Sequence, residues 1–304
     1  MPAYEVIDIP SHQQALVARV HHTRPDRANG ALPVLFVHGS SFPSGLSFDF
    51  CMDGQSWMDW MAARGYDVYA LDFPGYGLSD RYAADAPSPP GRAREVAQDV
   101  GSAVDAILCR TGKRQVLLVG HSWGGSVAAR YAQDHAFKVA GLVLFAAITP
   151  RTDRASEAVA AAEPAQAYEE LTPAQRVAAM DSLRPPPEPR QLHADVFTRW
   201  GAQWLASDAR RDGAVRFPAG PSADLADLQQ GRSYYDPARL DMPVLLVRGE
   251  WDAWPSDADY RALQSKIKGA RYASIPRGTH VMHLEAARTR LYEAVNGFLD
   301  QLTP

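Results

Sequence analysis

The sequence predicts an α/β protein built on a mostly parallel sheet with helices on both faces, and three observations support this fold class. Short, continuous apolar runs of the kind found in buried strands recur along the chain. Segments with apolar residues at helical spacing separate these runs, and loops rich in glycine and polar residues follow them. This alternation favours strands joined by helices, with ligands bound at the carboxyl ends of the strands.

The expected elements begin with a hairpin and then alternate. Strands are predicted at 4–9, 16–21, 33–37, 67–72, 115–119, 139–146, 243–247 and 270–275. Helices are predicted at 55–64, 94–111, 126–132, 257–268 and 284–302. The polar and glycine-containing loops after the strands are therefore expected to share one edge of the sheet.

The alternation stops between residues 150 and 235, where no clear parallel strand is seen. Helices are expected there at 154–167, 171–183 and 193–208. Thr172 is the expected N-cap of the second helix and Pro173 its first helical residue. The third helix carries aromatic residues at i, i+3 and i+7, namely Phe197, Trp200 and Trp204. We predict a core of residues 1–149 and 236–304 with a helical insertion at 150–235.

The candidate nucleophile is Ser122, which lies between an apolar strand and a helix in Gly120-His121-Ser122-Trp123-Gly124-Gly125. A turn this tight strains the backbone of its central residue and is tolerated only when small residues flank it. Gly120 and Gly124 meet that requirement. The motif predicts a serine hydroxyl held at the end of the sheet, in front of a helix N-terminus.

A serine hydroxyl needs a base within hydrogen-bond reach and a carboxylate that orients the base. His280 follows the last predicted strand and is the candidate base. Asp252 follows the strand before it and is the candidate acid, which gives the chain order Ser, Asp, His. Glu250, nearer the strand end, is the alternative acid. His283 is the alternative base, although we expect it to be a hydrogen-bonded packing residue in the closing helix.

Acyl transfer also requires donors for the oxyanion. One expected donor is the backbone N–H of Trp123, and the other is that of Ser40 or Ser41 in the loop after strand 33–37. Two histidines, His38 and His121, flank the site, and we expect them to brace it by hydrogen bonds rather than to act as bases.

The expected substrate pocket is apolar and rich in aromatic residues. Its candidate residues are Phe42, Trp123, Trp200, Trp204, Trp251 and Met282. The motif loops contain two arginines, Arg248 and Arg277, which we expect to form surface or structural ion pairs rather than to bind a substrate carboxylate. These features predict a carboxylic ester of a small apolar or aromatic molecule as the substrate.

Composition narrows the class of protein. The 304 residues include 46% hydrophobic and 22% charged residues, as is ordinary for a globular enzyme, and the net charge of −4 argues against nucleic acid as a partner. No apolar run approaches the length of a membrane span, and the first ten residues lack the features of a signal peptide. With two cysteines and no metal-ligand spacing, we expect a cytoplasmic protein without metal or cofactor, as a monomer or homodimer.

Taken together, these motifs resemble those of the α/β-hydrolase fold superfamily. The resemblance rests on His38-Gly39-Ser40-Ser41, Asp72-Phe73-Pro74-Gly75-Tyr76-Gly77-Leu78-Ser79, the Ser122 turn, Arg248-Gly249-Glu250-Trp251-Asp252 and Gly278-Thr279-His280. It implies an eight-stranded sheet, a helical cap after the sixth strand, and cofactor-free hydrolysis through an acyl-enzyme at Ser122. Dehalogenases and epoxide hydrolases of this superfamily use an aspartate nucleophile, which the serine here argues against.

Three alternatives stay open at this point. Ser122-Trp123-Gly124-Gly125 is similar to the nucleophile turn of proline iminopeptidases, whose oxyanion loop, however, reads differently from His38-Gly39-Ser40-Ser41-Phe42. The caps of those enzymes present carboxylates to an amino terminus, and this insertion contains Glu157, Glu163, Glu169 and Glu170. Hydrolases of carbon–carbon bonds share the same triad. A small-molecule binding protein on the same fold is the alternative that is not an enzyme.

Overall fold

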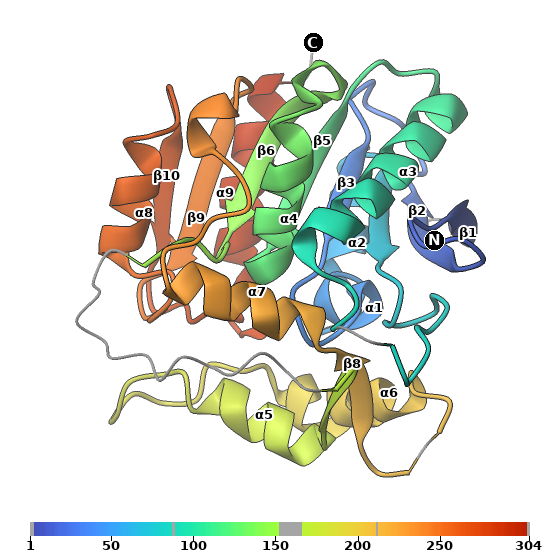
Figure 1. Ribbon diagram of the computed structural model, residues 1–304. Coiled ribbons are helices and arrows are strands. Elements are labelled where there is room, and N and C mark those ends of the chain that lie inside the picture. The colour runs from blue at the N-terminus through green and yellow to red at the C-terminus, as the bar shows by residue number, and fades with distance from the viewer. Residues whose placement is uncertain (1–2, 87–88, 152–165, 211, 303–304) are drawn as a thin grey trace.

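The computed structural model describes residues 3–86, 89–151, 166–210 and 212–302. Its centre is an eight-stranded sheet in the order β1-β2-β4-β3-β5-β6-β9-β10 (Figure 1). The strands are β1 (Ala3–Pro10), β2 (Val17–Arg24), β3 (Val34–Val37), β4 (Val68–Asp72), β5 (Val116–His121), β6 (Val139–Phe145), β9 (Val244–Gly249) and β10 (Arg271–Ile275). Strands β1, β2 and β4 pair antiparallel, and the pairs from β4 to β10 are parallel. The predicted fold class is confirmed.

Successive side chains of each strand point to opposite faces, so the sheet has two apolar faces. On β3, Leu35 and Val37 belong to a core shared with α3 (Ala93–Thr111), α4 (Ser122–Ala132) and α8 (Asp257–Gln264). Val34 and Phe36 belong to the opposite core, shared with α2 (Trp57–Ala62) and α9 (Arg288–Leu299). Figure 1 shows α3 and α4 in front of the sheet and α9 behind it. The sheet is therefore covered on both faces, as its continuous apolar strands require.

The predicted closing helix over 284–302 is wrong in its first part. A short 3₁₀ turn, η4 (Met282–Leu284), ends before α9 begins at Arg288. The interruption falls at Glu285, whose buried carboxylate turns back to accept a hydrogen bond from the Thr279 hydroxyl at 2.5 Å. That contact holds the loop before His280 against the chain that follows it.

The segment between β6 and β9 leaves the sheet. It contains β7 (Tyr168–Leu171), α5 (Pro173–Asp181), the π-helical turn η2 (Val196–Trp200), α6 (Gly201–Ala206), β8 (Val215–Pro218) and α7 (Gly220–Gln229). Helix α5 begins as predicted, because the Thr172 hydroxyl accepts the Gln175 N–H at 3.2 Å and Pro173 follows it. Strands β7 and β8 pair antiparallel and were not predicted, since such short, distant segments carry no local pairing signal. The helix expected at 154–167 lies almost entirely outside the described residues.

The aromatic stripe of the third predicted helix does not form one buried face. Trp200 and Trp204 are fully buried, whereas Phe197 is 40% exposed. The π-helical turn over Val196–Trp200 explains the difference, since it holds more residues per turn than an α-helix and rotates Phe197 away from the two tryptophans. Figure 1 shows α5 and α6 below the sheet, with α7 between them and the strands.

Candidate active site

The nucleophile turn has the strained geometry that its glycines predict. Ser122 is the first residue of α4, directly after β5, and its φ of 54° lies in the left-handed region. A Cβ on Gly120 would come within 2.5 Å of the Gly125 Cα, and one on Gly124 within 2.0 Å of the His38 carbonyl oxygen. No side chain fits at either position without moving the backbone, so both glycines are required for the strand and helix to meet.

Ser122, His280 and Asp252 lie in one hydrogen-bonded chain. The His280 Nε2 is 2.9 Å from the Ser122 Oγ, and its Nδ1 is 2.9 Å from the Asp252 Oδ2. With the Nδ1–H donating to the carboxylate, Nε2 is free to accept the serine proton, which is the tautomer that a base requires. Glu250 is exposed and accepts the Arg277 N–H at 2.8 Å, so it is not the carboxylate beside His280.

The loop that carries Asp252 is held by backbone hydrogen bonds. The Trp254 N–H donates to the Asp252 Oδ1 at 3.2 Å. Arg248 is buried and donates to the carbonyl oxygens of Asp252 at 2.6 Å and of Pro255 at 3.1 Å. Arg277 forms an ion pair with Glu188 at 3.1 Å, as expected. Arg248 has a structural role but makes backbone hydrogen bonds instead of the expected ion pair.

The loop after β3 lies against the nucleophile. A Cβ on Gly39 would be 3.1 Å from the Ser122 Cβ, and the Tyr76 hydroxyl donates to the Ser40 carbonyl oxygen at 2.5 Å. The Trp123 N–H is in the first turn of α4, where N–H groups have no intrahelical acceptor. The neighbourhood suits an oxyanion hole, and the assignment of its donors to Trp123 and to Ser40 or Ser41 stays a prediction.

Two histidines brace the loops around the site, as expected. The Phe73 N–H donates to the His38 Nε2 at 3.2 Å, and the His38 Nδ1–H donates to the Gly39 carbonyl oxygen at 2.7 Å. Burial lowers the pKa of His38 to about 4, so its ring stays neutral. The His121 Nε2–H donates to the His280 carbonyl oxygen at 3.0 Å. His38 thus fixes the loop after β3, and His121 fixes the loop that carries His280.

Comparison with known proteins places the chain in a family. A sequence model described as "Alpha/beta hydrolase family" matches residues 34–294. The chain belongs to the alpha/beta hydrolase family. Epoxide hydrolase B of Mycobacterium tuberculosis (strain ATCC 25618 / H37Rv) is 35% identical to this chain over 95 residues. The match covers 29% of this chain and 25% of the epoxide hydrolase. A non-heme haloperoxidase of Rhodococcus erythropolis is 36% identical over 128 residues, 39% of this chain and 38% of that protein. The chain thus spans less than two fifths of the length of these two relatives.

Solved structures agree with the chain over nearly its full length. E-2-(acetamidomethylene)succinate hydrolase superposes with a TM-score of 0.69 at 19% identity, covering 98% of this chain and 100% of that one. A thermophilic esterase from Thermogutta terrifontis superposes with a TM-score of 0.62 at 20% identity, covering 99% of this chain and 100% of that one. At such low identity these likenesses show that this family member shares their fold.

His283 is a packing residue of this α/β hydrolase, but the prediction that it forms hydrogen bonds is wrong. Its side chain is fully buried, and neither ring nitrogen has a partner within the described part of the chain. Its ring centroid lies 5.2 Å from that of Phe145 and 4.4 Å from that of His121. Burial, with a smaller effect from His280, lowers the pKa of His283 to about 3. An aromatic environment of this kind keeps the imidazole neutral.

We expect His283→Phe to reduce the loss of stability in acid. Between pH 7 and pH 5 the unfolded chain protonates His283, whose ordinary pKa is about 6.5, while the buried ring stays neutral. Wild-type stability should therefore fall with falling pH by about 2 kcal/mol more than that of the variant. Urea unfolding of both proteins at the two pH values measures this difference, since all other titrating groups are common to them. An equal pH dependence would contradict the buried neutral state.

Four of the candidate pocket residues occupy the junction between the core and the insertion. Phe42 packs against Trp200 with ring centroids 5.1 Å apart, and Trp204 lies 5.4 Å beyond Trp200. The Trp123 indole N–H donates to Asp224 of α7 at 2.9 Å. Trp251 is partly buried beneath Arg277, and Met282 is fully buried. Contact with substrate stays a prediction for all six residues.

The sequence does not reveal the roles of two residues that shape the site, Asp224 and Tyr76, because each contacts a residue far away along the chain. Asp224 accepts hydrogen bonds from the Trp123 indole and from the Arg92 guanidinium at 2.7 Å, and so ties α7 to the nucleophile helix. Tyr76 holds the oxyanion loop through Ser40. Tyr76 belongs to the motif at 72–79, but the motif does not indicate that its side chain binds Ser40. The sequence around Asp224 contains no motif that would point to a role in the site.

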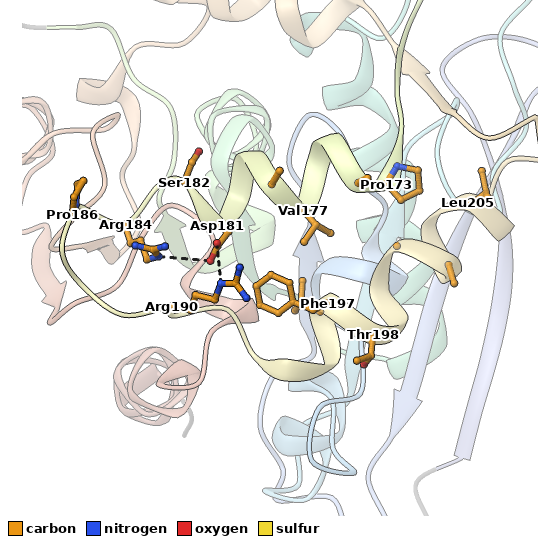
Figure 2. A pocket seen from close by; sticks show the side chains of 15 residues that line it. Pro173, Val177, Asp181, Ser182, Arg184, Pro186, Arg190, Phe197, Thr198 and Leu205 are labelled. Atoms are coloured by element: carbon orange, nitrogen blue, oxygen red, sulfur yellow. Dashed lines mark ion pairs between the residues drawn. The ribbon is translucent and has the colours of Figure 1, made fainter.

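A hollow of about 830 Å³ lies within the insertion, away from the triad (Figure 2). Pro173, Val177 and Asp181 of α5 line one side, and Phe197 and Leu205 lie on the other. Asp181 pairs there with Arg184 and Arg190 at 3.7 and 3.3 Å. The lining of this hollow includes none of Ser122, Asp252 and His280, so we assign the hollow no part in catalysis.

The described residues contain neither a candidate metal site nor a candidate membrane-spanning helix. Within residues 3–86, 89–151, 166–210 and 212–302, no cluster of histidine, cysteine or acidic side chains is arranged to hold a metal ion. In the same ranges, no helix combines the length and the apolar character that crossing a bilayer requires.

Proposed function

We propose that this protein hydrolyses a carboxylic ester of a small molecule through an acyl-enzyme at Ser122. The observation that supports this most is the continuous hydrogen-bonded chain from Ser122 through His280 to Asp252. Esterases are one class within the alpha/beta hydrolase family, and the family alone does not select among reactions. The proposal therefore rests on the residues of the site.

In the proposed reaction, the Ser122 Oγ attacks the ester carbonyl carbon while its proton passes to the His280 Nε2. Asp252 stabilises the imidazolium that forms, and backbone N–H groups of Trp123 and of Ser40 or Ser41 stabilise the oxyanion. The carbon–oxygen bond to the alcohol then breaks, and the alcohol leaves with the proton from His280. Water repeats these steps on the acyl-enzyme, releasing the acid and restoring Ser122.

The insertion at 150–235 is, in this proposal, a cap that sets which substrate reaches the core formed by 1–149 and 236–304. Trp200 of the insertion meets the loop after β3 at Phe42, and it also donates its indole N–H to the Leu46 carbonyl oxygen at 3.1 Å. Burial of apolar surface at this junction favours substrates with apolar or aromatic groups, by about 25 cal/mol per Å².

The amide-hydrolase alternative requires a carboxylate for a free amino terminus. Glu157 and Glu163 lie outside the described residues, and Glu170 pairs with Arg210 at 2.8 Å. Glu169 lies close enough to Tyr76 to raise the pKa of its hydroxyl, after the larger effect of burial. Of the two described candidates, Glu169 and Glu170, Glu169 is therefore the carboxylate that this alternative would use.

The ratio of kcat/KM for a short-chain aryl ester to that for a prolyl aryl amide tests the proposal. We expect the ester to be favoured by several orders of magnitude, because its leaving group is better and the triad has no need of an amino-terminus site. A preference for the prolyl amide that disappears in Glu169→Gln would establish the amide alternative instead. Turnover of neither compound, despite their binding, would favour the binding-protein alternative.

A further inference from the structure

Residues of helix α5 in the insertion contact two different environments, the surface hollow and the hydrophobic core. Pro173, Val177 and Asp181 line the surface hollow, as Figure 2 shows. Arg176 and Met180 are spaced i, i+4 and so lie next to each other on the helix, and neither of them lines the hollow. Met180 is buried in the core cluster that also contains Phe42 and Trp200. The side of α5 that carries Arg176 is therefore the side that packs toward the core.

The Arg176 guanidinium lies beside the oxyanion loop. Its Cζ is 5.4 Å from the centroid of the Phe42 ring, and that ring is 6.4 Å from the ring of His121. His121 directly precedes Ser122. The pKa of His121 is lowered mainly by burial and by His283 and His280, and the positive charge of Arg176 contributes as well. The cation is thus within electrostatic reach of the nucleophile turn.

This cation has no counter-charge among the described residues. Its Nε is buried without a hydrogen-bond partner, and no described carboxylate pairs with it. The six other arginines within 166–210 and 212–235 each pair with a carboxylate: Arg184, Arg190, Arg199, Arg210, Arg216 and Arg232. Burial lowers the pKa of Arg176 to about 10, which leaves it charged at neutral pH. A guanidinium presents five N–H donors, and leaving the buried Nε–H of Arg176 without an acceptor is costly.

We propose that Arg176 binds a carboxylate of the substrate, so that the ester cleaved at Ser122 carries a negative charge. This inference rests on the proposed ester hydrolysis and names the substrate class more narrowly. A planar guanidinium matches a carboxylate with two parallel hydrogen bonds, which supplies the acceptors that Arg176 lacks. Phe42, over which the guanidinium lies, contributes an apolar surface for the rest of the molecule. The expected substrate combines an apolar or aromatic body with one free carboxylate.

The test compares two aryl esters that differ only in charge. 4-Nitrophenyl hydrogen glutarate has a free carboxylate, and 4-nitrophenyl methyl glutarate has the same chain with that carboxylate masked. Wild-type protein should favour the charged ester in kcat/KM. Arg176→Gln should lower kcat/KM for the charged ester by about 10- to 100-fold and leave the neutral ester nearly unchanged. Arg176→Lys, which keeps the charge but loses the planar fork, should retain part of the preference.

Arg190→Gln is the matched control, because Arg190 belongs to the same cap but pairs with Asp181 and faces the hollow (Figure 2). It should leave both esters unchanged. An Arg176→Gln protein that processes the charged ester as well as wild type would overturn the inference. Equal losses on both esters, with a lowered melting temperature, would show that Arg176 only supports the cap and would overturn it too.

Calorimetric titration with glutarate separates this inference from the proposed function. If glutarate binds to wild-type protein but not to Arg176→Gln, the carboxylate site is supported. That conclusion would hold even if neither ester were hydrolysed, and only the proposed ester hydrolysis would then fail. Hydrolysis of both esters without any effect of Arg176 on glutarate binding would leave the hydrolysis standing and refute the carboxylate site.

Discussion

Replacing Ser122 by alanine is expected to lower kcat/KM for an aryl ester by about 10⁴-fold or more, as loss of the nucleophile does in other serine triads. The Ser122 Oγ is the atom at 2.9 Å from the His280 Nε2, and alanine has nothing to replace it. The fold should persist, because the left-handed backbone at this position is held by Gly120 and Gly124 on either side. Initial rates with a chromogenic ester, together with a melting curve, measure both effects.

Ser126→Ala is the matched control for this variant. Ser126 lies one turn further along α4, and its hydroxyl is 2.5 Å from the Tyr234 hydroxyl, in the protein interior. Its loss should lower the melting temperature while leaving turnover within about tenfold of wild type, since it removes two buried hydrogen bonds, to the Tyr234 hydroxyl and to the Trp123 carbonyl oxygen, and no reacting group. A Ser122→Ala protein that retains turnover comparable to Ser126→Ala would disprove the nucleophile assignment.

Replacing Asp252 by asparagine should lower kcat by roughly 10³- to 10⁴-fold. Asparagine retains the shape of the side chain but presents no negative charge to the imidazolium, and its amide favours the wrong imidazole tautomer. The backbone contacts of the loop, from Arg248 and from the Trp254 N–H, remain available to the variant. Steady-state kinetics should therefore show a loss of kcat at nearly unchanged stability.

Glu250→Gln tests whether Glu250, and not Asp252, is the acid that orients His280. Glu250 is two residues away and exposed, and its carboxylate accepts the Arg277 N–H of the neighbouring loop. Its conversion to glutamine should change kcat by less than about threefold, since a surface hydrogen bond contributes little. If Glu250→Gln proved the more damaging of the two substitutions, the acid would have been assigned to the wrong residue.

The three residues of the proposed triad could be predicted from the sequence because each follows a strand whose carboxyl end is set by the alternation of elements. Ser122 follows β5, Asp252 follows β9 and His280 follows β10, and these strands end at one edge of the sheet. The glycines around Ser122 added a backbone requirement that the structure bears out at Gly120 and Gly124. Local signals combined with parallel topology were enough to bring the three side chains together.

The structure of the insertion could be predicted from the sequence only in part, because its contacts depend on how it packs on the core. The N-cap of α5 at Thr172 is local chemistry and was predicted. The π-helical turn that exposes Phe197 and the pairing of β7 with β8 arise from tertiary packing. For the same reason, no local pattern indicates that Arg176 reaches the loop after β3, whereas Arg248 and Arg277 stand in recognisable motif loops.

Labelling with a serine-directed fluorophosphonate tests the central assignment most directly. Cleavage with trypsin after Arg114 and Arg130 releases a peptide of residues 115–130, in which Ser122 and Ser126 are the two serines. The proposed mechanism predicts one phosphonyl group per chain, placed on Ser122 by fragmentation of this peptide, with activity lost in proportion to labelling. Complete inactivation with the label on another residue, or undiminished labelling of the Ser122→Ala protein, would contradict it.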